Sequence, residues 1–159
     1  MLRWWRKLPP DFAGTLEADE HVLAFSGLVV ATPLGLWLPD SRRVGWHLIS
    51  KATWSGGALT VVEATVVSTV SGVDLLEDQP PQRFVLPDPG RIPQVVHERV
   101  TGSIRSRHRQ DLPGGGVWFL QRKVPGRGIV LQARPDPGTS MDLVSSIAAS
   151  VAAKLSSSR

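Results

Sequence analysis

The stretch LVVATPLGLWLPDSRRVGWHLISKATW, residues 28–54, decides the fold that this sequence predicts. Residues 29–38 are almost entirely apolar, and residues 39–42 then interrupt them with side chains that favour turns. Val44, Trp46 and Leu48 follow at a spacing of two, which places their side chains on one face of a strand. The stretch therefore predicts a long antiparallel hairpin that opens a meandering sheet, with Trp46 and Leu48 buried.

Shorter strands are expected on both sides of this hairpin. Residues 21–25 alternate in the manner of a strand, and residues 58–67 are rich in β-branched side chains. Residues 68–82 contain one glycine, three acidic residues and two prolines, which together predict a long acidic loop. A short strand at 83–86 follows this loop.

A helix is predicted after these strands, at residues 93–104. Its apolar face contains Ile92, Val95, Val96, Val100 and Ile104, and Pro93 suits the first helical turn. At about 100° per residue Arg99 falls inside the same face, so we expect its charge to meet an internal carboxylate. The basic run at 105–111 is then expected to leave the helix as an exposed loop, followed by a flexible glycine loop at 113–116.

A second hairpin and a final helix complete the predicted domain. The hairpin joins residues 117–124 to 129–134 across Gly126 and Gly128, which suit a turn with positive φ. The helix begins at Thr139 or Ser140, with Asp142 completing a partial capping box. Its apolar stripe comprises Val144, Ile147, Ala148, Val151, Ala152 and Leu155.

This order of elements predicts an α+β fold. We expect an antiparallel barrel-like sheet of about seven strands, with an inserted helix and a C-terminal helix that caps the sheet. Residues 1–15 form a Trp- and Arg-rich segment, and residues 16–159 are expected to form a single domain.

Residues 30–61, VATPLGLWLPDSRRVGWHLISKATWSGGALTV, resemble the second to fourth strands of bacterial pleckstrin-homology-like (PH-like) proteins. The segments GWHLISKA, PGRIPQVV, LPGGG and RPDPGT are similar to those of uncharacterised actinobacterial proteins, and this similarity covers nearly the whole chain. The resemblance implies a PH-like barrel and brings no activity with it. The helix at 93–104 departs from the seven strands and single terminal helix that are usual in PH-like folds.

Composition and motifs argue against several kinds of chemistry. The chain has 159 residues and no cysteine, which excludes disulfides and cysteine-based zinc sites. Its four histidines include no pair at the spacing of a metal site on one strand or helix face, and no G-x-S-x-G motif is present. The glycines at 114–116 precede a predicted strand, whereas a phosphate cradle precedes a helix. We therefore expect no catalytic residue, no cofactor and no metal, and a protein that is not an enzyme.

The charge distribution suggests a binding role. The net charge is +4, yet residues 91–134 carry nine basic and two acidic residues. This asymmetry indicates either attraction between parts of the fold or a docking surface. On the second interpretation the protein is a non-catalytic interaction module, and its basic patch meets a protein partner or an anionic surface. The patch is formed by Arg99, Arg105, Arg107, Arg109, Arg122 and Arg127. A nucleic-acid-binding protein using the same arginines and an enzyme of unknown reaction are the alternatives.

The N-terminal segment bears on location. Trp4 and Trp5 lie among Arg3, Arg6 and Lys7, a composition that suits either a peripheral membrane contact or packing of one tryptophan on the sheet. The basic residues precede no apolar core of a signal peptide. The longest apolar run, residues 28–38, is shorter than the roughly 20 residues of a membrane-spanning helix. We therefore expect a cytoplasmic protein.

Overall fold

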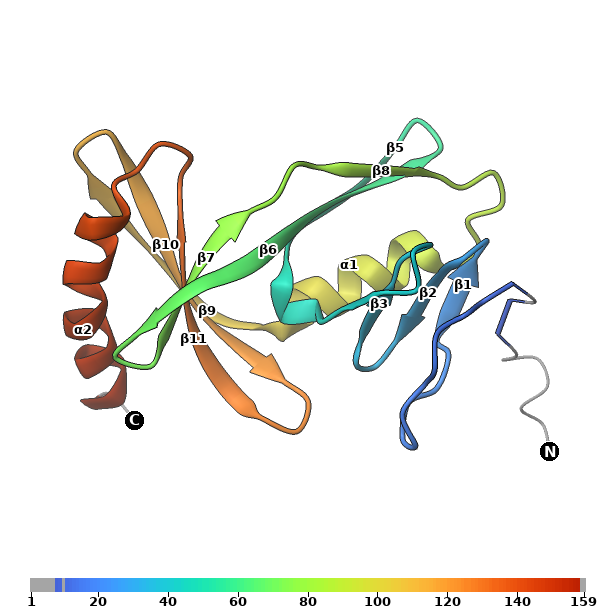
Figure 1. Cartoon of the computed structure of the whole chain (residues 1–159), viewed down its shortest axis with the longest axis horizontal. Helices are drawn as coiled ribbons and strands as arrows, with labels where there is room; N and C mark the ends of the chain where they lie inside the picture. The colour runs from blue at the N-terminus through green and yellow to red at the C-terminus, as the bar shows by residue number, and fades with distance from the viewer. Residues whose placement is uncertain (1–7, 10, 158–159) are drawn as a thin grey trace. The chain divides into compact units, whose positions relative to one another are not determined.

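A computed structural model describes residues 8, 9 and 11–157 of the chain (Figure 1). The described residues divide into two compact units, the first within residues 1–63 and 80–102 and the second within residues 64–79 and 103–159. The long strand β6 (Ala58–Val70) belongs to both. Whether residues 16–159 fold cooperatively as a single domain stays a prediction.

The first unit contains a four-stranded antiparallel sheet. Its strands are β1 (Ala24–Ser26), β2 (Val29–Thr32), β3 (Gly35–Trp37) and β4 (Arg43–Val44), in that spatial order. The apolar stretch 29–38 therefore forms two strands where one was predicted, because Pro33 cannot donate to a ladder and the chain turns there. A Cβ at Gly35 would clash with the Val44 carbonyl, so glycine at this position lets β3 lie against β4.

The second half of the decisive stretch is part turn and part helix. The turn at 39–42 is confirmed, because the Leu38 N–H donates to the Arg42 carbonyl at 3.0 Å. The strand predicted through Trp46 and Leu48 is wrong, since these residues form the 3-10 helix η2 (Trp46–Leu48). Trp46 is nevertheless buried, with Nε1 donating to the Thr32 carbonyl at 2.8 Å, whereas Leu48 is only partly buried. Both side chains reach the core from a helical turn, which explains why their spacing of two residues wrongly predicted a strand.

The core of the first unit lies between this sheet, a second group of strands and one helix. The strands are β5 (Ile49–Ser55), the first half of β6 and β8 (Gln82–Val85), and β6 pairs with both of the others. The helix is α1 (Ile92–Ser103), as predicted. Ile92, Val95 and Val96 of α1 pack in one cluster with Trp46, Ile49, Leu59 and Leu86.

The loop predicted at 68–82 is largely strand. β6 continues to Val70, and Ser71 (φ 52°) and Gly72 (φ 78°) form a two-residue turn into β7 (Val73–Asp78). Positive φ at both positions matches the twist of a tight hairpin. Val73 and Leu75 are buried while the intervening Asp74 is not, so this segment is a half-buried strand. Its acidic residues gave it the composition of a loop.

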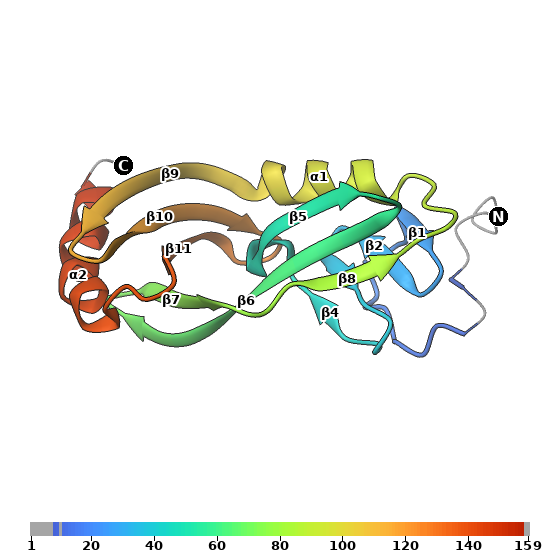
Figure 2. The same cartoon turned by 90° about the horizontal axis from the view of Figure 1, so that it is seen from above.

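The second unit is built on the sheet order β7-β11-β10-β9, which Figure 2 shows from above. Its further strands are β9 (Ile104–Leu112), β10 (Gly115–Val124) and β11 (Gly128–Pro135). The predicted hairpin at 117–134 is confirmed. The sheet is antiparallel apart from one pair, because β11 runs parallel to β7.

The C-terminal helix α2 (Met141–Ser157) packs on β11 and β7. Val144, Ala148 and Ala152 are buried with Leu75, Phe119 and Ala133, whereas the Leu155 side chain lies outside the described part. Ser140 caps the helix, accepting a hydrogen bond from the Leu143 N–H at 3.4 Å, while the Thr139 hydroxyl bonds to Gly116. The α+β class, with a curled barrel-like sheet, an inserted helix and a C-terminal helix, is confirmed. None of the described helices is both long and apolar enough to cross a membrane.

Candidate functional site

The basic run at 105–111 forms a strand, not the exposed loop that was predicted. These residues lie in β9, which pairs with β10 and stands at the end of the sheet order. The short turn at 113–114 brings the run directly against β10, and its consecutive exposed residues, 105–108, suit a strand at a sheet edge. Arg107 and Arg109 pair with Leu120 and Trp118, so they share one face of the sheet.

A β-bulge separates Arg105 from these two arginines. Ser106 pairs with Gln121 and Ile104 pairs with Arg122, which leaves Arg105 as the extra residue on β9. Arg105 lines a hollow with Gln121, and Gln121 lies on the same face as Phe119, opposite Arg107. The expectation that the three arginines share one face is therefore wrong, because it assumed an unbroken period of two.

Arg109 is held by carboxylates of its own chain. Its guanidinium donates to both oxygens of Asp136, at 3.0 and 2.5 Å, and Asp111 lies 3.5 Å from Nε. Hydrogen bonds from Arg109 hold the pKa of the Asp136 carboxyl below its ordinary value. The same guanidinium lies 5.4 Å from the ring centre of Trp118. Its charge is thus largely compensated within the fold.

Arg122 lies in the interior of the second unit, 3% exposed. Its Nε and Nη2 donate to Ser103 Oγ at 3.0 and 2.7 Å. Burial, with the nearby charges of Arg134 and Arg107, lowers the pKa of the Arg122 guanidinium to about 10. The structure therefore places Arg122 where it acts on the packing of the sheet and not on a surface ligand.

Arg127 lies near Arg105, at the turn of the β10–β11 hairpin. The two arginines line the hollow together with Gln121 and Ile129, and its volume is about 570 Å³. Both arginines are exposed, and neither forms an ion pair with a described residue. Of the predicted patch, the structure brings these two together.

Arg99 belongs to the first unit and is exposed. It makes no ion pair within the described chain, so the predicted internal carboxylate partner is wrong. The apolar face of α1 is buried at Ile92, Val95 and Val96 and less so at Val100, and Arg99 itself lies on the exposed side of the helix. Trp4 and Trp5 lie outside the described residues, and their predicted contacts stay predictions.

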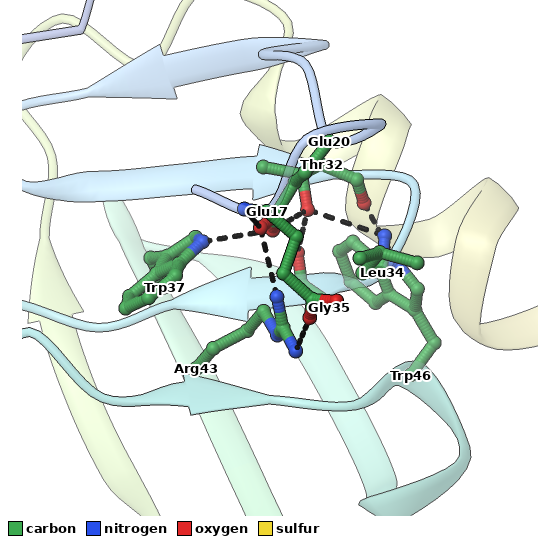
Figure 3. A network of polar contacts seen from close by, with 8 residues as sticks. All are labelled: Glu17, Glu20, Thr32, Leu34, Gly35, Trp37, Arg43 and Trp46. Atoms are coloured by element: carbon green, nitrogen blue, oxygen red, sulfur yellow. Dashed lines mark hydrogen bonds and ion pairs between the residues drawn. The ribbon is translucent and has the colours of Figure 1, made fainter. Parts of the chain in front are cut away.

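A polar network around Glu20 was missed by the sequence reasoning (Figure 3). The Glu20 side chain is fully buried in the first unit, and its carboxylate accepts hydrogen bonds from side chains of the sheet. The donors are Thr32 Oγ1 at 2.5 Å, Trp37 Nε1 at 3.0 Å, Arg43 Nη1 at 2.8 Å and the Glu17 N–H at 3.0 Å. The carboxylate therefore ties the segment before β1 to β2, β3 and β4.

The electrostatics of this network are those of a structural anchor. Burial by itself raises the pKa of Glu20, but hydrogen bonds from Thr32, the Glu17 N–H and Trp37, with the charge of Arg43, outweigh it and keep the pKa below 4.5. Arg43 also contacts Glu17 at 2.7 Å and lies 5.6 Å from the Trp37 ring centre. Since the carboxylate is enclosed by its own donors, it is not available to a substrate.

The network had a weak signal in the sequence. Glu17 and Glu20 are spaced by three, and Arg43 follows the turn at 39–42, but nothing local links the two segments. Within the described residues, no group of three or more histidine, aspartate or glutamate side chains is arranged to hold a metal ion.

No protein-family model, curated protein or solved structure matches this chain.

Proposed function

We propose that this protein is a non-catalytic interaction module that binds an acidic protein partner through the basic end of its second unit. The observation that supports the proposal is that some arginines of the second unit are paired with carboxylates and others are not. Arg109 and Arg134 are paired with Asp136 and Asp78, whereas Arg105, Arg107 and Arg127 are exposed and form no ion pair with a described residue, Arg107 on one face of this end of the sheet and the other two at the hollow on the opposite face. We call these last three the open arginines.

The surrounding sequence reinforces this surplus of charge. Residues 112–135 contain Arg122, Lys123, Arg127 and Arg134 and no acidic residue. Surface arginines are readily balanced by nearby carboxylates when their role is only to keep a domain hydrated. A basic region that lacks nearby carboxylates attracts anionic partners, and complementary charge raises the rate at which the two molecules meet. We place this function in the cytoplasm and assign the chain to the PH-like group as parts of the same proposal.

The test compares proteins captured from a lysate of the native host. The variant Arg105→Ser/Arg107→Ser/Arg127→Ser removes the open arginines, and Lys51→Ser/Arg83→Ser/Arg91→Ser removes three exposed positive charges from the first unit. We expect acidic proteins that bind the wild type at about 50 mM salt to be lost at about 300 mM, because exposed charges are screened. The first variant should lose them and the second should retain them.

Two further experiments test the other candidate ligands, a nucleic acid and a membrane. If labelled duplex DNA binds with the same dependence on the open arginines and displaces the captured proteins, the nucleic-acid alternative replaces the proposal. Sedimentation with anionic phospholipid vesicles, with and without residues 1–7, tests the membrane contact assigned to Trp4 and Trp5. Identical captured proteins for the wild type and the first variant would overturn the proposed function.

A further inference from the structure

An open surface hollow lies at the turn end of the β10–β11 hairpin. Its volume of about 570 Å³ lies within the range of sites that hold small molecules or side chains, roughly 300–1,000 Å³. Arg105 reaches it from the bulge of β9, Gln121 from β10, and Arg127 and Ile129 from the turn and the start of β11. Segments separated in sequence thus converge on one place within the second unit.

The polar groups that line the hollow are arranged as donors. The Ser106 hydroxyl donates to Gln121 Oε1 at 2.6 Å, so the amide oxygen is occupied and its NH₂ group can donate to a ligand. Each guanidinium presents several N–H groups in a fixed fork that matches a carboxylate. None of the described residues that line the hollow carries a carboxylate. A complementary ligand must therefore supply acceptors and negative charge.

The remaining wall of the hollow is apolar. Ile129 is 41% exposed, and it pairs across the hairpin with Lys123, which adds a further cation beside the hollow. A ligand that contacts Ile129 gains hydrophobic burial in addition to its ionic contacts. This combination suits a peptide that carries an apolar side chain next to acidic ones.

Aromatic groups argue against a nucleic acid in this place. Single-stranded nucleic acids are held largely by stacking of bases on aromatic side chains. Among the residues that the structure describes, no aromatic side chain lines the hollow. In the second unit Phe119 is 3% exposed, and the ring of Trp118 has the Arg109 guanidinium 5.4 Å from its centre. The hollow offers charge without a stacking surface.

We infer that this hollow binds an acidic segment of the partner protein in an extended conformation, with two carboxylates held by Arg105 and Arg127. Alternate residues of an extended peptide point to the same side, so glutamates spaced by two present both carboxylates together. The Gln121 amide donates to a peptide carbonyl, and an apolar side chain of the segment packs on Ile129. This inference rests on the proposed function and names the chemistry of its ligand.

The experiment measures fluorescence anisotropy of a labelled ten-residue peptide with glutamate at every alternate position except one, which carries leucine, so that the leucine points to the same side as the glutamates. A matched peptide has glutamine at each glutamate. The full-length wild type is compared with Arg105→Gln/Arg127→Gln and with the control Arg83→Gln/Arg91→Gln, which removes the same charge from exposed positions of the first unit. Circular dichroism verifies that every variant is folded.

We expect the wild type to bind the glutamate peptide and not the glutamine peptide. Loss of Arg105 and Arg127 should weaken binding at least tenfold, since charge-assisted hydrogen bonds are removed, while the control stays within about twofold. The variant Arg105→Lys/Arg127→Lys should bind with intermediate affinity, because lysine keeps the charge and lacks the fork.

Three results would overturn the inference. These are equal weakening by the two glutamine variants, no binding of the glutamate peptide, or competition by inorganic phosphate at concentrations well below that of the peptide. If the peptide fails while captured acidic partners still depend on the open arginines, the proposed function stands and the hollow is not the peptide site. If the captured partners are also unchanged, both fail.

Discussion

At the scale of single residues, Glu20 shows how a buried charge orders a terminus. Its carboxylate is fully buried yet surrounded by donors from Thr32, Trp37 and Arg43, so replacing one carboxylate oxygen with an amide NH₂ would remove the charge and leave some of those donors without an acceptor. We expect Glu20→Gln to lower the free energy of unfolding by about 2–4 kcal/mol at pH 7. Urea denaturation measures this loss. Glu17→Gln is the control, because that side chain is 63% exposed and should cost less than about 1 kcal/mol.

The same residue predicts a pH dependence. The pKa of Glu20 in the folded protein lies below its ordinary value of 4.5. The stability it contributes is therefore complete above pH 4.5 and is lost as the pH falls through the lower folded pKa. The difference in unfolding free energy between the wild type and Glu20→Gln should shrink as the pH falls from about 5 to 3. A difference that stays constant would contradict the role of the charge.

The arginines of β9 should differ in their effect on stability. Arg109 is held by Asp136 and lies over Trp118, whereas Arg107 is exposed and forms no ion pair with a described residue. Arg107→Ser should leave the melting temperature within about 1–2 °C, the usual range for surface positions. Arg109→Ser should lower it by more than that. Equal melting temperatures for the two variants would show that the Asp136 contact contributes nothing.

At the scale of elements, local periodicity predicted some segments and failed for others. α1 and the β10–β11 hairpin were predicted because apolar spacing and the turn glycines agreed. β7 and β9 were missed because acidic and basic side chains cover their exposed positions, and both were interpreted as loops. A strand with many exposed polar side chains and a polar loop differ little in composition. Pairing with a strand that is distant in sequence determines which of the two forms.

The C-terminal helix provides a test at this scale. Val144, Ala148 and Ala152 of α2 cover Leu75, Val117 and Phe119, which would otherwise face water. Truncation after Gly138 should therefore give insoluble protein or a compact state without a cooperative melting transition. Near-UV circular dichroism and differential scanning calorimetry detect that loss. A truncated chain that unfolds cooperatively would show that α2 is dispensable.

At the scale of the whole molecule, β6 is common to both compact units. Residues before position 64 pair with β5 and β8, and residues from 64 onward pair with β7. If residues 16–159 form a single cooperative domain, amides in both halves of β6 should exchange with deuterium through the same global unfolding. Native-state exchange followed by NMR should give equal opening free energies for Val61 and Ala64 at low denaturant. A clearly lower value on one side would mean that the two units unfold separately.

The candidate site was less predictable than the fold class for a physical reason. Composition showed that residues 91–134 are basic, but not which arginines are balanced. Arg134 is paired with Asp78, which is 56 residues away in sequence, and Arg109 with Asp136, 27 residues away. In addition, the β-bulge in β9, which no residue type in the sequence predicts, places Arg105 on the opposite face of the sheet from Arg107. Compensation of charge is a property of tertiary pairing and could not be deduced from spacing.

The position of β9 at the sheet edge has a consequence for the behaviour of the protein at high concentration. Nine residues of an edge strand form a template on which a second molecule can extend the sheet, the first step toward cross-β aggregates. In such a pairing the arginines of one molecule would face those of the next, so mutual repulsion opposes it. Polyanions that neutralise these side chains would weaken the repulsion, and we expect dense anionic polymers to promote fibrillar self-association.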